Sequence, residues 1–417
     1  MNRNKWVSLI VSLLLVFSLS FPAFAQLKGE IEIFSWWTAG GEAEGLQALF
    51  DIYTKKYPDV KVINATVAGG AGTNAKAVLK TRMLGGDPPD TFQVHAGKEL
   101  TDTWVKTGFM EPLTDLFKSE GWLKVMPKGI LDIVSYRGNY WSVPVNIHRA
   151  NVLWYNKKVF KDNGLTPPKT FDEFFKVADA LKAKGVIPFV LGTKDGWEAA
   201  HVFETILIAK LGAEGYKGLW TGKTKWSNPK VTEALEILKK LFTYINPDHS
   251  AATWDEAYQY IISGKGAMSI MGDWAAGYFF SKGYPDFGWA PVPETAGVFD
   301  ALSDSFGLPK GCKNRDNVIA FLRVLGSKEG QEAFNIKKGS IPARTDINKN
   351  LFPEYQKSCM EDWMKDTIVP SVIHGAAAAE GWVTEFKDVI SLFIARPDIS
   401  TTQKALIQIA NRAGVKQ

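Results

Sequence analysis

Hydrophobic and polar positions alternate between strand-like and helix-like periods along the first hundred residues. Residues 30–34, Glu-Ile-Glu-Ile-Phe, have the period of two that a half-buried strand shows, and residues 46–56 are typical of a helix that ends before Pro58. The pattern continues with a strand at 60–67, a helix at 75–84 and a short buried strand at 90–94. Strands that alternate with helices predict a mainly parallel sheet covered by helices.

The remaining chain continues this α/β pattern. A hairpin is predicted at 135–143, where Gly138-Asn139 lies between aromatic residues, and Thr170 with Glu173 forms a capping-box pattern before a helix with one apolar face. Further helices are predicted at 202–211, 231–241, 317–325 and 384–394, and further strands at 268–271 and 287–290. No repeat or flexible linker separates these elements, so we expect any domains to be joined by short, ordered segments.

The first 25 residues have the pattern of a secretory signal peptide. Arg3 and Lys5 precede an apolar run over 6–17, and an Ala-Phe-Ala cleavage site ends at Ala25. The apolar run is too short to cross a hydrocarbon core of ~30 Å, which argues against a membrane anchor. Gln26 stands where a lipoprotein has cysteine, so we expect cleavage after Ala25, no lipid attachment and a freely diffusing periplasmic protein.

Composition narrows the classes of protein that remain. Removing 25 of the 417 residues leaves 392, and about 100–200 residues per domain then predicts two domains. The 46% of hydrophobic residues is ordinary for a globular protein with sizeable cores. Cleavage also removes two cations and lowers the net charge from +5 to +3. No basic run or face is evident, so nucleic acid is not an expected partner.

Two cysteines, Cys312 and Cys359, would be exported to an oxidising compartment. Bridged, they would close a loop of about 47 residues and stabilise the fold by ~4 kcal/mol in the chain-entropy model. Two separate buried thiols are the alternative. Spacing does not decide between them, because a bridge requires the two Cα atoms to lie within ~7 Å.

An aromatic pair is the first candidate for ligand binding. Trp36 and Trp37 end the first strand, and ligands of open α/β sheets bind beyond the carboxyl ends of strands. Indole rings pack against the apolar faces of sugars, whose hydroxyls are left to polar neighbours. The alternative interpretation makes both tryptophans ordinary core residues.

Polar side chains follow other predicted strands. Gln93 and His95 lie at the end of the strand at 90–94, and each offers a donor and an acceptor to a hydroxyl group. A lone histidine, however, is more often a structural residue. Asp304 places a carboxylate among small residues in Leu-Ser-Asp-Ser-Phe-Gly, where the chain would cross between two domains.

These segments, in their order and spacing, resemble the bacterial extracellular solute-binding proteins of sugar ABC importers, the family related to maltose-binding protein. The likeness covers essentially the whole mature chain. Its most specific stretches are Gly86-Asp87-Pro88-Pro89-Asp90, Pro112-Leu113-Thr114-Asp115, Tyr155-Asn156-Lys157, Pro167-Pro168-Lys169-Thr170-Phe171-Asp172-Glu173, Gly307-Leu308-Pro309 and Gly339-Ser340-Ile341-Pro342. A closer likeness to the glucose/galactose-binding branch is carried by Phe34-Ser35-Trp36-Trp37, Gln93-Val94-His95-Ala96-Gly97, Met271-Gly272-Asp273-Trp274 and Ile373-His374-Gly375.

The resemblance implies a type II periplasmic-binding-protein fold, with two helix-covered α/β lobes and a ligand cleft between them. We predict an N-terminal lobe at 26–139 plus 298–345 and a C-terminal lobe at 146–290 plus 346–417. The chain would cross between the lobes at the hinge segments 140–145 and 291–297.

The resemblance also implies a set of ligand-binding residues drawn from both lobes. They are Trp36, Trp37, Glu42, Gln93 and His95 from the first lobe, Asp304 and Lys338 from its returning segment, and Trp254, Trp274 and His374 from the other lobe. Glu44, two residues after Glu42, is an alternative in the same loop. Asp304 and Lys338 have a second interpretation as a salt bridge without a ligand role.

The function predicted on this basis is a monomeric receptor that captures a glucose- or galactose-type monosaccharide by lobe closure and delivers it to the permease of an ABC importer. No cofactor and no metal are implied. The sequence lacks H-E-x-x-H, C-x-x-C, G-x-S-x-G and Walker A motifs, and its five histidines lack metal-ligand spacing. The alternatives are a secreted carbohydrate-active hydrolase with a carboxylate pair, or a receptor of the same fold for an oligosaccharide, a polyamine or another small solute. Glucose, galactose, xylose and disaccharides all stay open.

Overall fold

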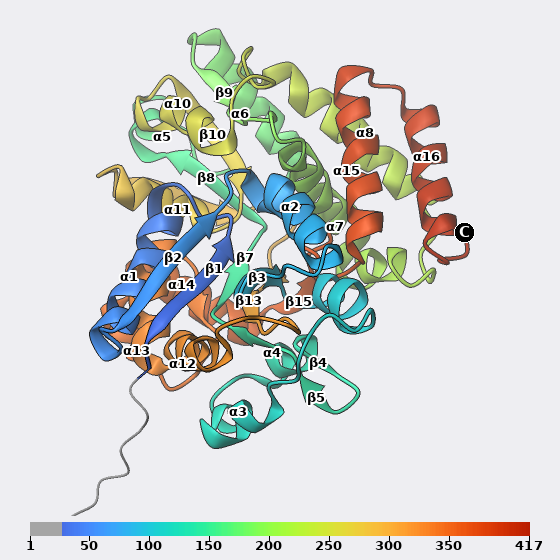
Figure 1. Ribbon diagram of the computed structural model, residues 1–417. Helices are drawn as coiled ribbons and strands as arrows, with labels where there is room; N and C mark the ends of the chain where they lie inside the picture. Colours follow the sequence, from blue (N-terminus) through green and yellow to red (C-terminus); the bar gives the residue numbers. More distant parts are fainter. Residues whose placement is uncertain (1–26) are drawn as a thin grey trace, which may run out of the picture.

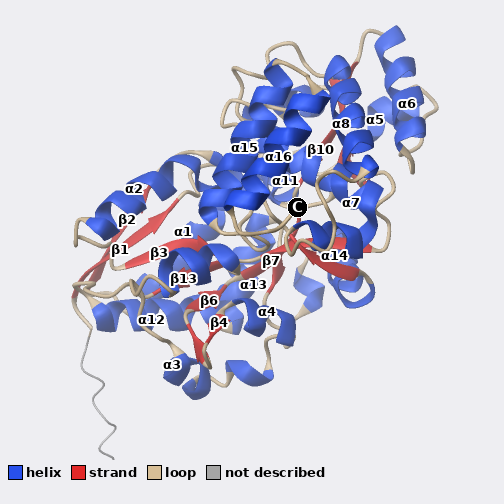
Figure 2. Cartoon of the chain, turned by 90° about the vertical axis from the view of Figure 1, so that its right-hand side faces the viewer, coloured by secondary structure: helices blue, strands red, loops and turns tan. Residues whose placement is uncertain are grey.

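The computed structural model describes residues 27–417, and its buried side chains form two hydrophobic cores. One core draws mostly on residues 31–145 and 306–334, and the other mostly on residues 147–302 and 341–410. Figures 1 and 2 show the corresponding two lobes, which we call the first and second lobe. The predicted signal peptide and its cleavage site lie outside the described residues. The lobe ranges and hinge crossings that the sequence predicts stay predictions.

The first lobe is built on a five-stranded sheet in the order β2-β1-β3-β13-β6. Its strands are β1 (Gly29–Ser35), β2 (Val60–Thr66), β3 (Thr91–His95), β6 (Ser142–Pro144) and β13 (Asp304–Gly307). The first three are parallel, as predicted, whereas β13 runs antiparallel to β3 and places Asp304 opposite His95. Helices of this lobe are α1 (Gly40–Lys56), α2 (Thr73–Leu84), α3 (Thr114–Ser119), α4 (Lys128–Ile133), α12 (Arg315–Gly326) and α13 (Lys328–Lys338).

The second lobe has a four-stranded sheet in the order β11-β8-β10-β9. Its strands are β8 (Val152–Asn156), β9 (Ile187–Phe189), β10 (Gly266–Met271) and β11 (Phe287–Pro291). Only the pair β10 and β9 is parallel, so the prediction of a mainly parallel sheet is wrong for this lobe. The physical reason is that strand direction depends on where the chain re-enters the sheet. The local alternation of strand and helix carries no information about that re-entry.

Helices surround the second-lobe sheet (Figure 1). They are α5 (Lys157–Asp162), α6 (Phe171–Ala183), α7 (Trp197–Leu219), α8 (Pro229–Leu241), α9 (Trp254–Ala257), α10 (Gln259–Ile262), α11 (Trp274–Ser281), α14 (Glu354–Lys365), α15 (Glu380–Ala395) and α16 (Ile399–Arg412). The Thr170 hydroxyl caps α6 by accepting from the Glu173 amide at 3.1 Å, while the Glu173 carboxylate accepts from the Lys169 amide instead of closing the predicted box. No helix within residues 27–417 has the length and apolar character needed to cross a membrane.

A third sheet lies where the two lobes meet, in the order β14-β7-β12-β15. It contains β7 (Asn146–Arg149), β12 (Val298–Leu302), β14 (Ile341–Pro342) and β15 (Thr367–Pro370). Single residues, Val145 and Ser303, connect it to strands of the first-lobe sheet. Side chains of α13 hold the first of these connections, since Gln331 donates to the Pro144 carbonyl and Asn335 to the Val145 carbonyl, both at 2.9 Å. The lobes are therefore joined by short, ordered segments, as predicted.

The predicted hairpin is present as β4 (Ser135–Tyr136) and β5 (Asn139–Tyr140). Its turn lies one residue earlier than predicted, at Arg137-Gly138, because both of these residues have the positive φ that a tight two-residue hairpin turn requires.

The structure contradicts the possible disulfide. Cys312 and Cys359 are both free thiols. Cys312 packs at the edge of the first-lobe core, whereas Cys359 is buried in the second-lobe core. The alternative of two separate thiols is the one that the fold adopts, because each cysteine belongs to a different core.

Candidate functional site

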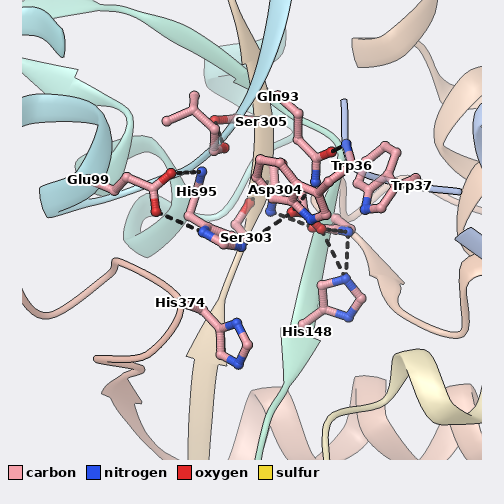
Figure 3. Close-up of polar contacts among 12 residues, drawn as sticks. Trp36, Trp37, Gln93, His95, Glu99, His148, Ser303, Asp304, Ser305 and His374 are labelled. Atoms are coloured by element: carbon pink, nitrogen blue, oxygen red, sulfur yellow. Dashed lines mark hydrogen bonds and ion pairs between the residues drawn. The ribbon is translucent and has the colours of Figure 1, made fainter. Parts of the chain in front are cut away.

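A cavity lies between the two lobes, with about 340 Å³ of empty space including its mouth. Nine of the ten predicted site residues line it, and they come from both lobes. They are Trp36, Trp37, Glu42, His95, Trp254, Trp274, Asp304, Lys338 and His374. The tenth, Gln93, lies behind this wall. Figure 3 shows the polar part of the wall, which is built where β3, β7 and β13 come together.

Gln93 positions other residues from behind the cavity wall. Its side-chain carbonyl accepts from the Ser35 hydroxyl at 2.7 Å and from the Trp36 amide at 3.3 Å. Its amide nitrogen donates to Asp304 at 2.9 Å. One buried side chain therefore fixes both the end of β1, where the two tryptophans begin, and the carboxylate of β13 (Figure 3).

The two neighbouring tryptophans differ in their surroundings. The Trp36 ring faces His95 at a centroid distance of 5.0 Å and lines the cavity, with 6% of its surface exposed. The Trp37 ring packs against Phe334 at 4.8 Å and Phe306 at 5.7 Å, and only 1% of its surface is exposed. Trp37 thus combines the two interpretations that the sequence left open, since it lines the cavity and belongs to the core.

Asp304 is the central carboxylate of the site. It is buried and accepts from Gln93 and Asn146, both at 2.9 Å, and from the His148 ring at 3.1 Å. Burial alone would raise the pKa of Asp304, but the hydrogen bond and charge of His148, with the charge of Lys338, hold it well below its usual range. The group is therefore a carboxylate at every physiological pH and accepts hydrogen bonds only.

His148 was not predicted as a site residue. It lies on β7 between Asp304 and Asp273, whose carboxylate hydrogen-bonds the other ring nitrogen. Although burial lowers the pKa of His148, the charge of Asp273 and the hydrogen bonds to both carboxylates raise it overall. One signal in the sequence could have indicated His148. In Asn146-Ile147-His148, the two polar residues alternate with an apolar one, so a strand directs both to the same face.

His95 belongs to a second buried charge cluster. Its Nδ1 lies 2.9 Å from Glu99, which also accepts from Lys76 at 2.7 Å. Burial raises the pKa of Glu99, but Lys76 and His95 lower it to about 2. This fixed carboxylate orients the His95 ring and leaves Nε2 on the side of Asp304, at 3.8 Å.

Two neutral histidines face this cluster from the second lobe. His374 Nε2 lies 3.2 Å from His201 Nδ1, so one ring donates and the other accepts. Burial lowers the pKa of His201 to about 3, and burial together with the neighbouring histidines holds the pKa of His374 well below its usual range. His374 follows β15 in a loop whose backbone donates to the Glu204 carboxylate of α7 at Val372 and Ile373.

Glu42 and Lys338 lie together on the first-lobe side of the cavity. Glu42, at the start of α1, forms an ion pair with Lys338, at the end of α13, while Glu44 lies outside and pairs with Lys337 at 3.5 Å. Lys338 Nζ also lies 5.5 Å from the Trp37 ring centre and 5.7 Å from that of Trp274. The structure thus places Glu42, and not Glu44, at the cavity. Lys338 pairs with Glu42. The alternative of a salt bridge between Lys338 and Asp304 is therefore not the pairing that the structure has.

Five residues that line the cavity were not predicted: Gly70, Ala71, His148, Trp197 and Leu302. Gly70 belongs to the first lobe, and its amide donates to Asp195 of the second lobe at 3.0 Å. Trp197 is the first residue of α7, directly after Gly196 in a left-handed conformation. No sequence motif marks these residues as a group, because they come from separate segments of the chain that meet only in the folded protein.

The arrangement suits a small neutral molecule with hydroxyl groups. Aromatic rings supply apolar surfaces, and the carboxylates already have basic or amide partners. Within residues 27–417, no group of three or more histidine, cysteine or acidic side chains is arranged to hold a metal ion.

Two lobes that enclose one cavity define the class of two-lobed type II binding proteins. Residues 37–332 match the family model described as bacterial extracellular solute-binding protein, and the chain belongs to this family. A probable sugar-binding periplasmic protein of Mesorhizobium japonicum is 34% identical over 96% of this chain and 97% of its own. An uncharacterized ABC transporter extracellular-binding protein of Pyrococcus horikoshii is 41% identical over 94% of this chain and 89% of its own.

A more distant relative and two solved structures extend the comparison. The glucose-binding protein GlcS of Saccharolobus solfataricus is 26% identical over 73% of this chain and 59% of its own. The bacterial solute receptor AcbH, described with an exclusive preference for β-D-galactopyranose, superposes with a TM-score of 0.83 at 21% identity, covering 92% of this chain and 99% of its own. A sugar transporter protein of Bacillus licheniformis in complex with stachyose gives a TM-score of 0.75 at 18% identity, covering 92% and 100%. Both structures share the fold of this chain.

Proposed function

We propose that this protein is a periplasmic receptor that encloses a monosaccharide of the glucose or galactose type and delivers it to the permease of an ABC importer. The observation that carries the proposal is the cavity itself. Tryptophans Trp36, Trp254 and Trp274 provide apolar walls from both lobes, and Asp304 with His374 provides polar groups between them. A pyranose ring offers the matching surfaces, with apolar faces and a rim of hydroxyls.

Charge pairing in the cavity supports a neutral ligand. Glu42 is paired with Lys338, Glu99 with Lys76, and Asp304 with His148. A polyamine would need carboxylates without such partners, because a buried ammonium group must be matched by negative charge. The polyamine alternative is therefore disfavoured.

The same pairing argues for a non-enzymatic role. A hydrolase needs one carboxyl group that is protonated near neutral pH and can act as a general acid. Asp304 has a pKa well below its usual range and three donors on its two oxygens. Glu42, the other carboxylate of the cavity, is bound to Lys338. We infer that the pocket binds its ligand without changing it.

The small empty space of the cavity, about 340 Å³ with its mouth, favours a monosaccharide over an oligosaccharide. A sugar that contacts the cavity on all sides leaves an unpaired polar group wherever one of its hydroxyls is missing or displaced, at ~1–3 kcal/mol. One relative of this chain is named for glucose binding, and two structures of the same fold are named for galactopyranose and stachyose. Sugar size is thus the question that needs measurement.

We expect closure of two lobes about the third sheet to trap the sugar, with the protein acting as a monomer. Binding from both lobes would shift the open and closed populations toward the closed one. The closed form would then dock on the importer subunits.

Calorimetry on the mature protein, freed of bound sugar by partial unfolding and refolding, tests the proposal. D-glucose or D-galactose should bind at least about tenfold more tightly than maltose or maltotriose, as one unpaired polar group implies. Equal or tighter binding of maltotriose would overturn the monosaccharide assignment and leave the receptor role intact. Release of reducing sugar from aryl glycosides would overturn the non-enzymatic role.

A further inference from the structure

Two tryptophans that line the cavity, Trp37 and Trp197, have an indole N–H without a partner in the described chain. The Nε1 atoms of both are buried and have no hydrogen-bond partner within residues 27–417. Trp37 packs into the core of its own lobe, whereas Trp197 meets the opposite lobe at Gly70. Trp197 itself is 1% exposed, and its side chain lines the cavity. A buried N–H group without a partner costs ~1–3 kcal/mol, so such a group in a binding site calls for a partner that arrives with the ligand.

The missing partner alone would not distinguish Trp197, because Trp226 in the core of the second lobe also has an unpartnered Nε1 within the described chain. The difference lies in the surroundings. Trp226 lies within the core and lines none of the walls of the cavity, whereas Trp197 is one of its wall residues. Trp226 thus provides a matched control.

Gly70 of the first lobe lies directly against the Trp197 indole. A Cβ atom added to Gly70, which also lines the cavity, would stand only 2.5 Å from Trp197 Nε1. The absence of a side chain at Gly70 therefore lets the two lobes meet beside the indole N–H. The Gly70 amide donates to Asp195, so it is not a second free donor at this place.

Neighbouring rings fix the direction of the donor. The Trp197 ring has centroid distances of 5.7 Å to His374, 5.8 Å to His201 and 6.0 Å to Trp274. With aromatic neighbours at these distances, the indole does not turn to find another acceptor. It is a preorganised donor, which is the property that makes a polar group discriminate between ligands.

We propose that Trp197 is a specificity-determining residue whose indole N–H donates to one hydroxyl oxygen of the bound sugar. This inference rests on the proposed sugar-binding function. A sugar that lacks an oxygen at this place would leave the N–H unpaired in the closed cleft and bind more weakly.

The test compares Trp197→Phe with Trp226→Phe, which removes an equally buried indole from the same lobe. Calorimetry with whichever of D-glucose and D-galactose the wild type binds more tightly should show about tenfold weaker binding for W197F and unchanged binding for W226F. A series of monodeoxy analogues of that sugar should contain one that loses affinity in the wild type and loses nothing further in W197F.

A direct reading comes from the indole N–H resonances of ¹⁵N-labelled protein. The resonance absent from the W197F spectrum should shift downfield when sugar is added to the wild type, and the resonance absent from the W226F spectrum should stay in place. If W197F does not fold, assignment of the wild-type resonance by triple-resonance NMR gives the same comparison. Equal affinities of W197F and W226F, or an unmoved Trp197 resonance, would overturn this inference alone. A wild type that binds neither monosaccharide would overturn the proposed function together with it.

Discussion

At the scale of single residues, the two adjacent tryptophans have different roles although they share one strand end. The Trp37 ring packs on Phe306 and Phe334, whereas Trp36 faces His95 and the cavity. Adjacent residues of an extended segment point to opposite sides, which separates their functions.

The first prediction follows from this difference. Trp37→Ala should lower the free energy of unfolding of the sugar-free protein by roughly 3–5 kcal/mol, as loss of a core aromatic does, and Trp36→Ala by much less. Both variants should bind sugar more weakly. Urea unfolding without sugar and calorimetry with sugar measure the two effects, and equal losses of stability would contradict the division of roles.

The second prediction concerns pH. The pKa of His201 is lowered to about 3 by burial, while an unfolded histidine titrates near 6.5. The unfolded state therefore binds the proton between these values, and the stability that the neutral ring contributes above pH 6.5 is lost as the pH falls toward 3. From pH 7 to pH 5 this loss amounts to about 2 kcal/mol.

His201→Gln should remove that part of the pH dependence. Urea unfolding of the wild type and the variant at pH 7 and pH 5 measures the difference between them. His148, whose pKa is raised, contributes with the opposite sign in both proteins, and His374, whose pKa is lowered, contributes with the same sign as His201. Glu99, with a pKa of about 2, stays charged in the folded protein between pH 7 and pH 5 and adds little to the pH dependence of stability there. The same pH slope in both proteins would show that the His201 ring is protonated in the fold.

At the scale of elements, helix α7 positions the loop that carries His374. The Glu204 carboxylate accepts from the Ser371 hydroxyl at 3.1 Å, from the Tyr216 hydroxyl, and from the amides of Val372 and Ile373. Glu204 is fully buried, so this single side chain replaces the hydrogen bonds that the loop would otherwise make with water.

The third prediction tests that role. Glu204→Leu leaves these donors unpaired, so it should reduce both stability and sugar affinity, the latter because His374 is no longer held. Thr170→Ala, which removes the cap of α6 away from the cavity, is the control. It should cost about 1 kcal/mol of stability and leave sugar affinity unchanged. If sugar affinity in Glu204→Leu matches the control, the loop keeps its position without Glu204.

At the scale of the whole molecule, the lobes touch directly at the mouth of the cavity. Gly70 of the first lobe donates to Asp195, and its missing side chain lets Trp197 of the second lobe approach. Gly70 is thus a position where any side chain would stand between the lobes.

The fourth prediction follows. Gly70→Ala should weaken sugar binding on the order of tenfold, because the added methyl group opposes closure by an overpacking cost of ~1–3 kcal/mol. Unfolding of the sugar-free protein should be unchanged, since the contact joins two lobes. Gly129→Ala, where the added Cβ meets nothing within 4 Å, is the matched control. Small-angle scattering measures the sugar concentration at which each protein becomes compact, and G70A should need more sugar than the wild type. Compaction of both proteins at the same sugar concentration would contradict the steric argument.

The sequence by itself determined the elements and most of the wall of the cavity. Periodicity located the strand at 30–34 and the helix at 46–56, because hydrophobic spacing reflects neighbours only two to four positions apart. Nine of the ten residues implied by the resemblance line one cavity. Position at the end of a strand accounts for Trp36, Trp37 and His95, whereas the resemblance supplied the residues on helices and loops.

Only the tertiary structure decided how distant segments meet. It showed that the second-lobe sheet is mixed, that Cys312 and Cys359 belong to different cores, and that His148 and Trp197 face the cavity. The different cores of the two cysteines and the place of His148 follow from chain crossings between the lobes through single-residue connections such as Val145 and Ser303. The mixed sheet instead forms between strands that lie between these two crossings. Such a crossing leaves no periodic pattern, because the side chains it brings together lie more than a hundred positions apart along the chain.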